Sequence, residues 1–149
     1  MPDGDLVLID GGGELYDYSS DITRTVPVNG TFSPSQKAVY DAVLTVNQAI
    51  IDQCRPSTGL SLSDLHALSL EYFTEHLKVL GILSKTVEGN SAHHIVQKYF
   101  PHAIGHFLGM DVHDTPDLSL STKLAEGMII TVEPGLYFPL HDTTIPSRQ

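Results

Sequence analysis

The stretch LVLIDGGG at residues 6–13 joins four apolar residues to an aspartate and three glycines. An apolar run of this length, bounded by turn residues, predicts a buried strand, and the glycines permit a tight backbone after it. Residues 16–20 and 22–28 are predicted to be extended as well, before a turn at Asn29 and Gly30. We therefore expect neighbouring strands here, with Asp10 at the end of the first.

Three helices are predicted in the middle of the sequence. Ser33 and Pro34 can form the N-cap and first residue of a helix that continues at helical spacing to about Cys54. A second helix is predicted over residues 63–80, with Gly81 as its C-terminal cap, and a third over residues 92–99. Residues 128–132 are then predicted as a strand. This order is typical of an α+β fold with helices packed on one face of a mostly antiparallel sheet.

Composition narrows the classes of partner. The formal net charge is -10, and an acidic chain lacks the basic surface that nucleic-acid backbones and anionic membranes require. The charge fits binding of cations or of a peptide with a free amino terminus, and it equally fits a plain acidic surface. Cys54 is the single cysteine, so neither an intrachain disulfide nor a cysteine-type zinc site can form.

Four separated residues could bind metal: Asp10, Asp21, His106 and Glu133. A carboxylate at the end of an apolar strand is costly to bury unless it is paired or bound to a cation. Asp10 and Asp21 would face each other in a hairpin, and their repulsion would favour bound cations. Carboxylates with one imidazole suit manganese, cobalt, iron or zinc. Two such ions can share a hydroxide and polarise a carbonyl, which is the apparatus for amide hydrolysis.

Each of these residues also has an ordinary explanation. Asp10 could be a turn residue, Asp21 could pair with Arg24, His106 could be a packed core histidine, and Glu133 could be a solvated strand end. Their joint occurrence in distinctive local strings favours the metal site. The remaining histidines are predicted to be surface or packing residues: His66, His76, His93, His94 and His141.

Five strings along the sequence resemble the aminopeptidase P (Xaa-Pro aminopeptidase) family. The resemblance covers nearly the whole chain, and the details around Pro101-His102 and His113–Asp117 are most similar to the mitochondrial branch. The strings are Ile9–Gly12, Ser20–Thr25, Pro27–Gly30, His106–Asp114 and Thr131–Tyr137.

The resemblance implies a pita-bread fold, a curved antiparallel sheet that holds two divalent metal ions, usually manganese. It implies that Asp10 and Asp21 bind one metal, and that Asp21 bridges to the second. It places His106 and Glu133 on the second metal. The implied reaction removes the amino-terminal residue from peptides with proline in second position, through attack by a metal-bridging hydroxide.

Three residues are implied as catalytic. Glu133 would also serve as the proton shuttle. His113 would stabilise the developing oxyanion, and His102 would border the proline side of the pocket and assist the leaving group. No nucleic-acid or membrane partner is expected, and the parent protein is expected to be a mitochondrial homodimer, with a cytoplasmic location as the alternative.

The family pattern also includes a bridging glutamate and an amino-terminal domain that match no residues of this sequence. Residues 1–149 are therefore expected to be a single, C-terminally truncated catalytic domain with low or no activity alone. Two alternatives stay open. A prolidase-type enzyme would cleave dipeptides only, and a non-catalytic pita-bread module would bind peptides or histones without metal. The module has no reason to keep all four ligands.

Overall fold

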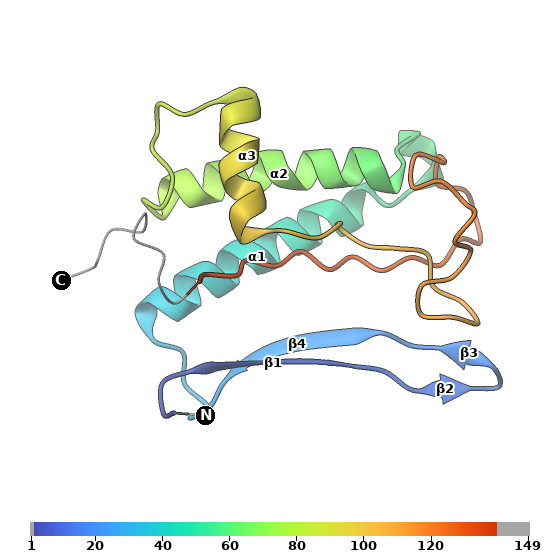
Figure 1. Cartoon of the computed structure of the whole chain (residues 1–149), viewed down its shortest axis with the longest axis horizontal. Coiled ribbons are helices and arrows are strands. Elements are labelled where there is room, and N and C mark those ends of the chain that lie inside the picture. The colour runs from blue at the N-terminus through green and yellow to red at the C-terminus, as the bar shows by residue number, and fades with distance from the viewer. Residues whose placement is uncertain (1, 140–149) are drawn as a thin grey trace.

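The computed structural model describes residues 2–139, which form a long hairpin below a layer of helices (Figure 1). His141 lies outside the described residues. No helix in the described part of the chain is both long and apolar enough to cross a membrane. The elements in chain order are β1 (Leu6–Gly11), β2 (Glu14–Leu15), β3 (Tyr18–Ser19), β4 (Ile22–Pro27), α1 (Pro34–Gln53), the short 3-10 helix η1 (Pro56–Thr58), α2 (Leu62–Val79) and α3 (Gly89–Tyr99).

The predicted neighbouring strands are confirmed as an antiparallel pair of β1 and β4, in a register that places Leu6 opposite Pro27 and Asp10 opposite Thr23. The prediction that the first strand is buried is wrong within the described residues, because five of the six residues of β1 are exposed. The predicted strand at 16–20 is wrong in part. Tyr16 and Asp17 both have positive φ, 51° and 66°, and form the turn between β2 and β3. A two-residue hairpin turn favours positive φ at both central positions because its twist then matches that of the strands.

The predicted helices are confirmed with small shifts at their ends. Ser33 caps α1 and exchanges reciprocal hydrogen bonds with Gln36, which satisfies two backbone N–H groups that the first turn leaves free. Ser61 and Asp64 make the same box at the start of α2, and Gly81 follows α2 with a φ of 73°. The third helix begins at Gly89, before the predicted start.

The hydrophobic core lies between the helices and the chain that follows them. Ten apolar residues of this core are completely or almost completely buried. The rings of Phe73 and Phe100 are in contact, with centroids 5.3 Å apart, and connect α2 to the end of α3. The buried set includes Val46, Ile50, Leu62, Leu65, Phe73, Leu77, Ala92, Val96, Phe100 and Ile104. The helical layer thus provides most of the apolar burial.

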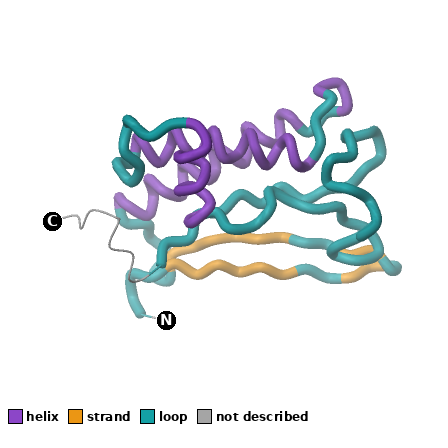
Figure 2. Tube along the Cα trace, turned by 45° about the horizontal axis from the view of Figure 1, so that its top comes forward, coloured by secondary structure: helices purple, strands orange, loops and turns teal. Residues whose placement is uncertain are grey.

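Residues 100–109 and 128–138 run between the helices and the hairpin, and a loop with several turns joins them at one end of the molecule (Figures 1 and 2). Backbone N–H groups of Thr131 and Glu133 donate to the carbonyls of His106 and Ile104 at 2.9 and 2.8 Å. The predicted strand at 128–132 is nevertheless wrong as a regular strand: Ile130 makes a single isolated bridge with Phe107. The ladder is interrupted because the His106 N–H donates to the Thr131 side chain at 3.0 Å and not to the Thr131 carbonyl.

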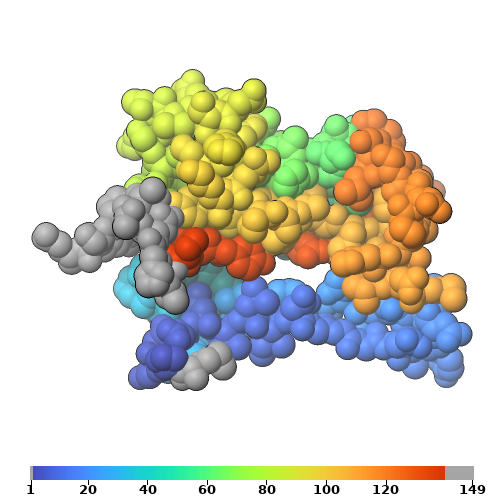
Figure 3. All heavy atoms as spheres, in the orientation of Figure 1, coloured from blue at the N-terminus to red at the C-terminus, as the bar shows by residue number. Residues whose placement is uncertain are grey.

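The hairpin is tied to the rest of the chain near both of its ends. At its base the Gln36 side chain donates to the Gly4 carbonyl at 2.7 Å. Near its tip the Ser19 N–H donates to the Gly109 carbonyl at 2.8 Å, and the Ser19 hydroxyl donates to the Met110 carbonyl at 3.1 Å. Between these ties an open gap separates the hairpin (blue) from the chain above it (Figure 3).

Candidate metal centre

Three of the four predicted ligands meet where the hairpin approaches the extended chain. Nε2 of His106 lies 3.2 Å from Oδ2 of Asp21 and 3.2 Å from Oε1 of Glu133. One ligand atom from each residue can be chosen so that all lie within 4.8 Å of one another. Asp21 comes directly before β4, whereas His106 and Glu133 come from the two paired extended segments. The side chains are largely shielded, with exposed fractions of 17, 19 and 36% in that order.

The orientation of the His106 ring makes this cluster suited to a cation. Its Nδ1–H donates to the Phe107 carbonyl at 2.9 Å, so in the neutral ring the lone pair of Nε2 faces the carboxylates of Asp21 and Glu133. Three electron-rich atoms then converge in a partly desolvated space, which is unfavourable without a positive charge between them. A ring N–H held by a backbone carbonyl is also the usual arrangement of a metal-binding histidine. The donor set therefore fits a divalent transition metal.

Asp10 stands apart from this group. The hairpin register pairs Asp10 with Thr23, not with Asp21, so the expectation that the two aspartates face each other directly is corrected. Gly12 lies so close to the carbonyl of Ser20, the residue before Asp21, that a side chain at Gly12 would overlap it. Asp21 is a diagonal neighbour of Asp10, at a separation of roughly 7–8 Å in typical antiparallel pairs. Asp10 is exposed and stays a predicted ligand.

His113 lies beside the cluster. Its ring is edge-on to that of His106, with centroids 4.4 Å apart and an interplanar angle of 84°. The loop that carries it is fixed by the Asp114 N–H, which donates to the Phe107 carbonyl at 3.1 Å. Asp114 also packs so closely on Gly109 that a side chain at Gly109 would overlap its carboxylate. His113 is thereby presented, exposed, next to the three ligand atoms.

His102 lies farther along the same extended chain and pairs with a tyrosine. Its Nδ1–H donates to the Ala103 carbonyl at 2.8 Å, so Nε2 accepts the Tyr137 hydroxyl at 3.1 Å. Burial raises the pKa of Tyr137, and the nearby charges of Glu133 and Asp10 raise it further. The phenol therefore stays protonated and keeps donating at neutral pH.

Residues 1–146 match metallopeptidase family M24. The chain belongs to this family. Xaa-Pro aminopeptidase 3 of Rattus norvegicus is 49% identical over 148 residues, which are 99% of this chain and 28% of that protein. Xaa-Pro dipeptidase of Homo sapiens is 42% identical over 156 aligned residues, covering 95% of this chain and 31% of that protein.

Among solved structures of M24 relatives, Icp55 of Saccharomyces cerevisiae matches with a TM-score of 0.87 and 42% identity, over 99% of this chain and 36% of the yeast chain. The α+β class and the partial pita-bread fold are confirmed by this match. The chain spans less than a third of the length of the two curated relatives.

Two polar residues beside the predicted ligands and His102 were not predicted from the sequence to have a role in the site. Tyr137 holds His102, and the Thr131 hydroxyl donates to Oε1 of Glu133 at 2.7 Å. A signal for Thr131 was present in the sequence. In extended chain, residues two apart share a face, so a polar residue two positions before a predicted ligand is a candidate partner for it.

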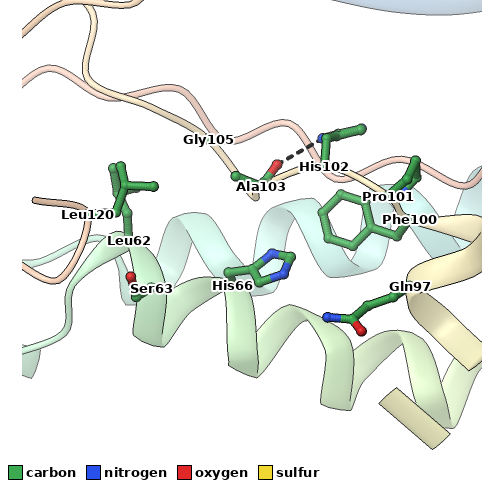
Figure 4. A pocket seen from close by; sticks show the side chains of 10 residues that line it. All are labelled: Leu62, Ser63, His66, Gln97, Phe100, Pro101, His102, Ala103, Gly105 and Leu120. Atoms are coloured by element: carbon green, nitrogen blue, oxygen red, sulfur yellow. Dashed lines mark hydrogen bonds between the residues drawn. The ribbon is translucent and has the colours of Figure 1, made fainter. Parts of the chain in front are cut away.

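A cavity of about 340 Å³ lies behind the His102 segment, between α2, the end of α3 and residues 100–105. Figure 4 shows His66 projecting from α2 towards this segment, with Phe100 beside it. Nδ1 of His66 is buried and has no hydrogen-bond partner among the described residues. Burial lowers the pKa of His66, and the electrostatic interaction with the nearby His102 ring lowers it further. His66 therefore packs as a neutral ring against Phe100, with centroids 5.4 Å apart.

Proposed function

We propose that these residues form the metal-binding part of an Xaa-Pro aminopeptidase that uses two divalent metal ions, with manganese preferred. The observation that carries the proposal is the convergence of Asp21 Oδ2 and Glu133 Oε1 on His106 Nε2, each at 3.2 Å, in a chain of the M24 family. Asp10 is proposed as a further ligand, through its diagonal position relative to Asp21 in the hairpin.

The bound metals would supply Lewis-acid polarisation of the peptide carbonyl and a water acidic enough to attack at neutral pH. The residues of this chain would do the rest. Glu133 would accept and pass on a proton at its carboxylate, and His113, beside His106, would donate to the carbonyl oxygen as charge develops on it. His102, held by Tyr137, would border the proline side and assist the leaving nitrogen.

The substrate is proposed to be a peptide with proline second, as the name of the rat relative states for that protein. We also propose that the parent protein is a homodimer in mitochondria. The resemblance implies a fifth, bridging carboxylate ligand that matches no residue of this sequence. For that reason we propose that turnover by these 149 residues alone is slow or absent.

A second candidate is a dipeptidase restricted to Xaa-Pro, which the match to human Xaa-Pro dipeptidase favours. The two candidates share the metal centre and differ in the length of peptide accepted. A tripeptide with two prolines separates them, because a dipeptidase excludes a substrate that extends beyond the proline.

The test measures release of the amino-terminal residue from Xaa-Pro-Pro, Xaa-Ala-Pro and Xaa-Pro by the purified chain with added Mn²⁺. We expect slow or no release from Xaa-Pro-Pro, with any release dependent on Mn²⁺, and tighter binding of this peptide than of Xaa-Ala-Pro by calorimetry. Asp21→Asn should abolish both, with Asp117→Asn, an exposed loop aspartate, as the matched control. Release from Xaa-Pro alone would favour the dipeptidase. A chain that neither cleaves nor binds any of the three, or binding that survives in Asp21→Asn, would contradict the proposal.

A further inference from the structure

Thr131 connects two of the three clustered ligands through one hydroxyl group. Its Oγ1 accepts the backbone N–H of His106 at 3.0 Å and donates to Oε1 of Glu133 at 2.7 Å. The residue is 8% exposed, one of four buried polar residues in the described part of the chain. A buried hydroxyl that is fully paired in this way fixes the geometry of both partners.

The directions of these two hydrogen bonds are set by the partners. An ionised Glu133 can only accept, so the hydroxyl proton of Thr131 must point to it. The His106 N–H can only donate, so it must meet a lone pair of the same oxygen. Neither role can be exchanged, and the hydroxyl therefore has one orientation. The bond to a carboxylate is also the stronger, charge-assisted type.

The same hydroxyl replaces a bond of the sheet ladder. The Thr131 N–H donates to the His106 carbonyl at 2.9 Å, and a regular antiparallel pair would return a bond from the His106 N–H to the Thr131 carbonyl. That N–H goes to the side chain instead. The Thr131 carbonyl lies so close to Gly105 that any side chain there would overlap it. The ladder hydrogen bond is therefore missing at His106, the residue whose ring faces Asp21 and Glu133.

We propose that Thr131 is a positioning residue of the metal centre: its hydroxyl sets the Glu133 carboxylate and the His106 backbone relative to each other so that both ligand atoms face one ion. This inference rests on the proposed function. Threonine suits the task because its branched side chain is restricted at χ1, which holds the hydroxyl in place, whereas valine has the same shape without the hydroxyl. Serine keeps the hydroxyl without the branch.

The test compares Thr131→Val and Thr131→Ser with the wild-type chain. Thr74→Val is the matched control, because Thr74 is also buried, at 6% exposure, and its hydroxyl donates to the Leu70 carbonyl at 2.8 Å, away from the ligands. Mn²⁺ affinity is measured by calorimetry, and exchange of the His106 amide proton by NMR without metal. Urea midpoints show whether the two valine variants lose comparable stability.

Thr131→Val is expected to weaken Mn²⁺ binding by about 10–100-fold, the usual loss when a partner of a metal ligand is removed, and to speed exchange of the His106 amide. Thr131→Ser should recover most of the affinity, and Thr74→Val should bind Mn²⁺ as the wild type does. Equal Mn²⁺ affinity in the wild type and Thr131→Val, or an unchanged His106 amide, overturns the positioning role while the proposed function stands. A wild-type chain that binds no Mn²⁺ overturns the proposed function and this inference with it.

Discussion

The apolar side chains of the helical layer are buried, whereas many of those of the hairpin are exposed. In the helices Val46, Ile50 and Phe73 are completely buried, whereas Ile9 and Ile22 on the hairpin are 58 and 55% exposed. Both regions have the apolar pattern typical of their secondary structure. Only the helices bury that pattern within the described residues, so the stability of the chain is concentrated there.

The difference matters because the predicted ligands are divided between the two regions. Asp10 and Asp21 belong to the hairpin side, and His106 and Glu133 belong to the chain packed beneath the helices. The geometry of the centre thus depends on how firmly the lightly packed hairpin is held against the well-packed layer. The Ser19 bonds to Gly109 and Met110 hold it close to the centre.

The largest effect is expected from Phe73→Ala. Truncation of a fully buried phenylalanine removes apolar burial and leaves a cavity, at a cost of about 3–5 kcal/mol in the free energy of unfolding. Ile22→Ala on the hairpin should cost less than about 1 kcal/mol, because the side chain is already half exposed. Urea unfolding followed by circular dichroism measures both values. Equal losses in the two variants would show that the hairpin is as well packed as the helices.

A smaller loss of stability is expected from Gly12→Ala, which tests how closely the hairpin strands pack next to Asp21. A Cβ at Gly12 would overlap the Ser20 carbonyl, while one at Gly13 meets nothing within 4 Å. Gly12→Ala should therefore cost about 1–3 kcal/mol, as overpacking usually does, and should displace Asp21 and weaken Mn²⁺ binding. Gly13→Ala is the matched control and should be close to neutral. Equal Mn²⁺ affinity in the two alanine variants would show that the close contact at Gly12 does not position Asp21.

The smallest effect concerns acid stability of the helical layer. Hydrogen bonds from the Lys123 side chain at 2.7 Å and then from Ser61 hold the pKa of Asp64 well below its usual range. Because the folded-state pKa lies below the unfolded one, this stabilisation is present above pH of about 4 and is lost as the pH falls further.

Asp64→Asn should therefore reduce the difference in urea midpoint between pH 7 and pH 3, and Asp117→Asn should leave most of it. The change should be modest, since the Lys123 and Asp64 side chains are 62 and 42% exposed and such pairs contribute little. An unaltered midpoint difference in Asp64→Asn would show that this carboxylate does not contribute to acid sensitivity.

Much of the fold could be predicted because its signals are local. Ser33 and Pro34 mark the start of α1, and an apolar run followed by three glycines marks the first strand of the hairpin. The failure at 128–132 has a different origin, because it depended on a contact with a residue distant in the sequence. The regular strand predicted at 128–132 is interrupted because Thr131 uses its hydroxyl in place of a ladder bond to His106.

The sequence could predict which residues belong to the site, but it could predict less of how they are arranged in space. Apolar strands that end in Asp10 and Glu133 indicated ligands through the cost of burying a charge. Spacing could not show that Asp10 would pair with Thr23, since strand register is set by the turn and by side-chain packing. Nor could it show that Thr131 joins His106 to Glu133, because that contact exists only after residues 104–108 and 129–133 have paired.

The central claim is that His106, with Asp21 and Glu133, holds a divalent ion between the two regions, and a Co²⁺ titration followed by proton NMR tests it most directly. The Nδ1–H of His106, bonded to Phe107, should give a strongly shifted, exchangeable signal that saturates as Co²⁺ is added. The signal should disappear in His106→Ala and persist in His94→Ala, an exposed histidine of α3, with urea midpoints confirming that both variants fold. A shifted signal that survives in folded His106→Ala, or is lost in His94→Ala, would contradict the account.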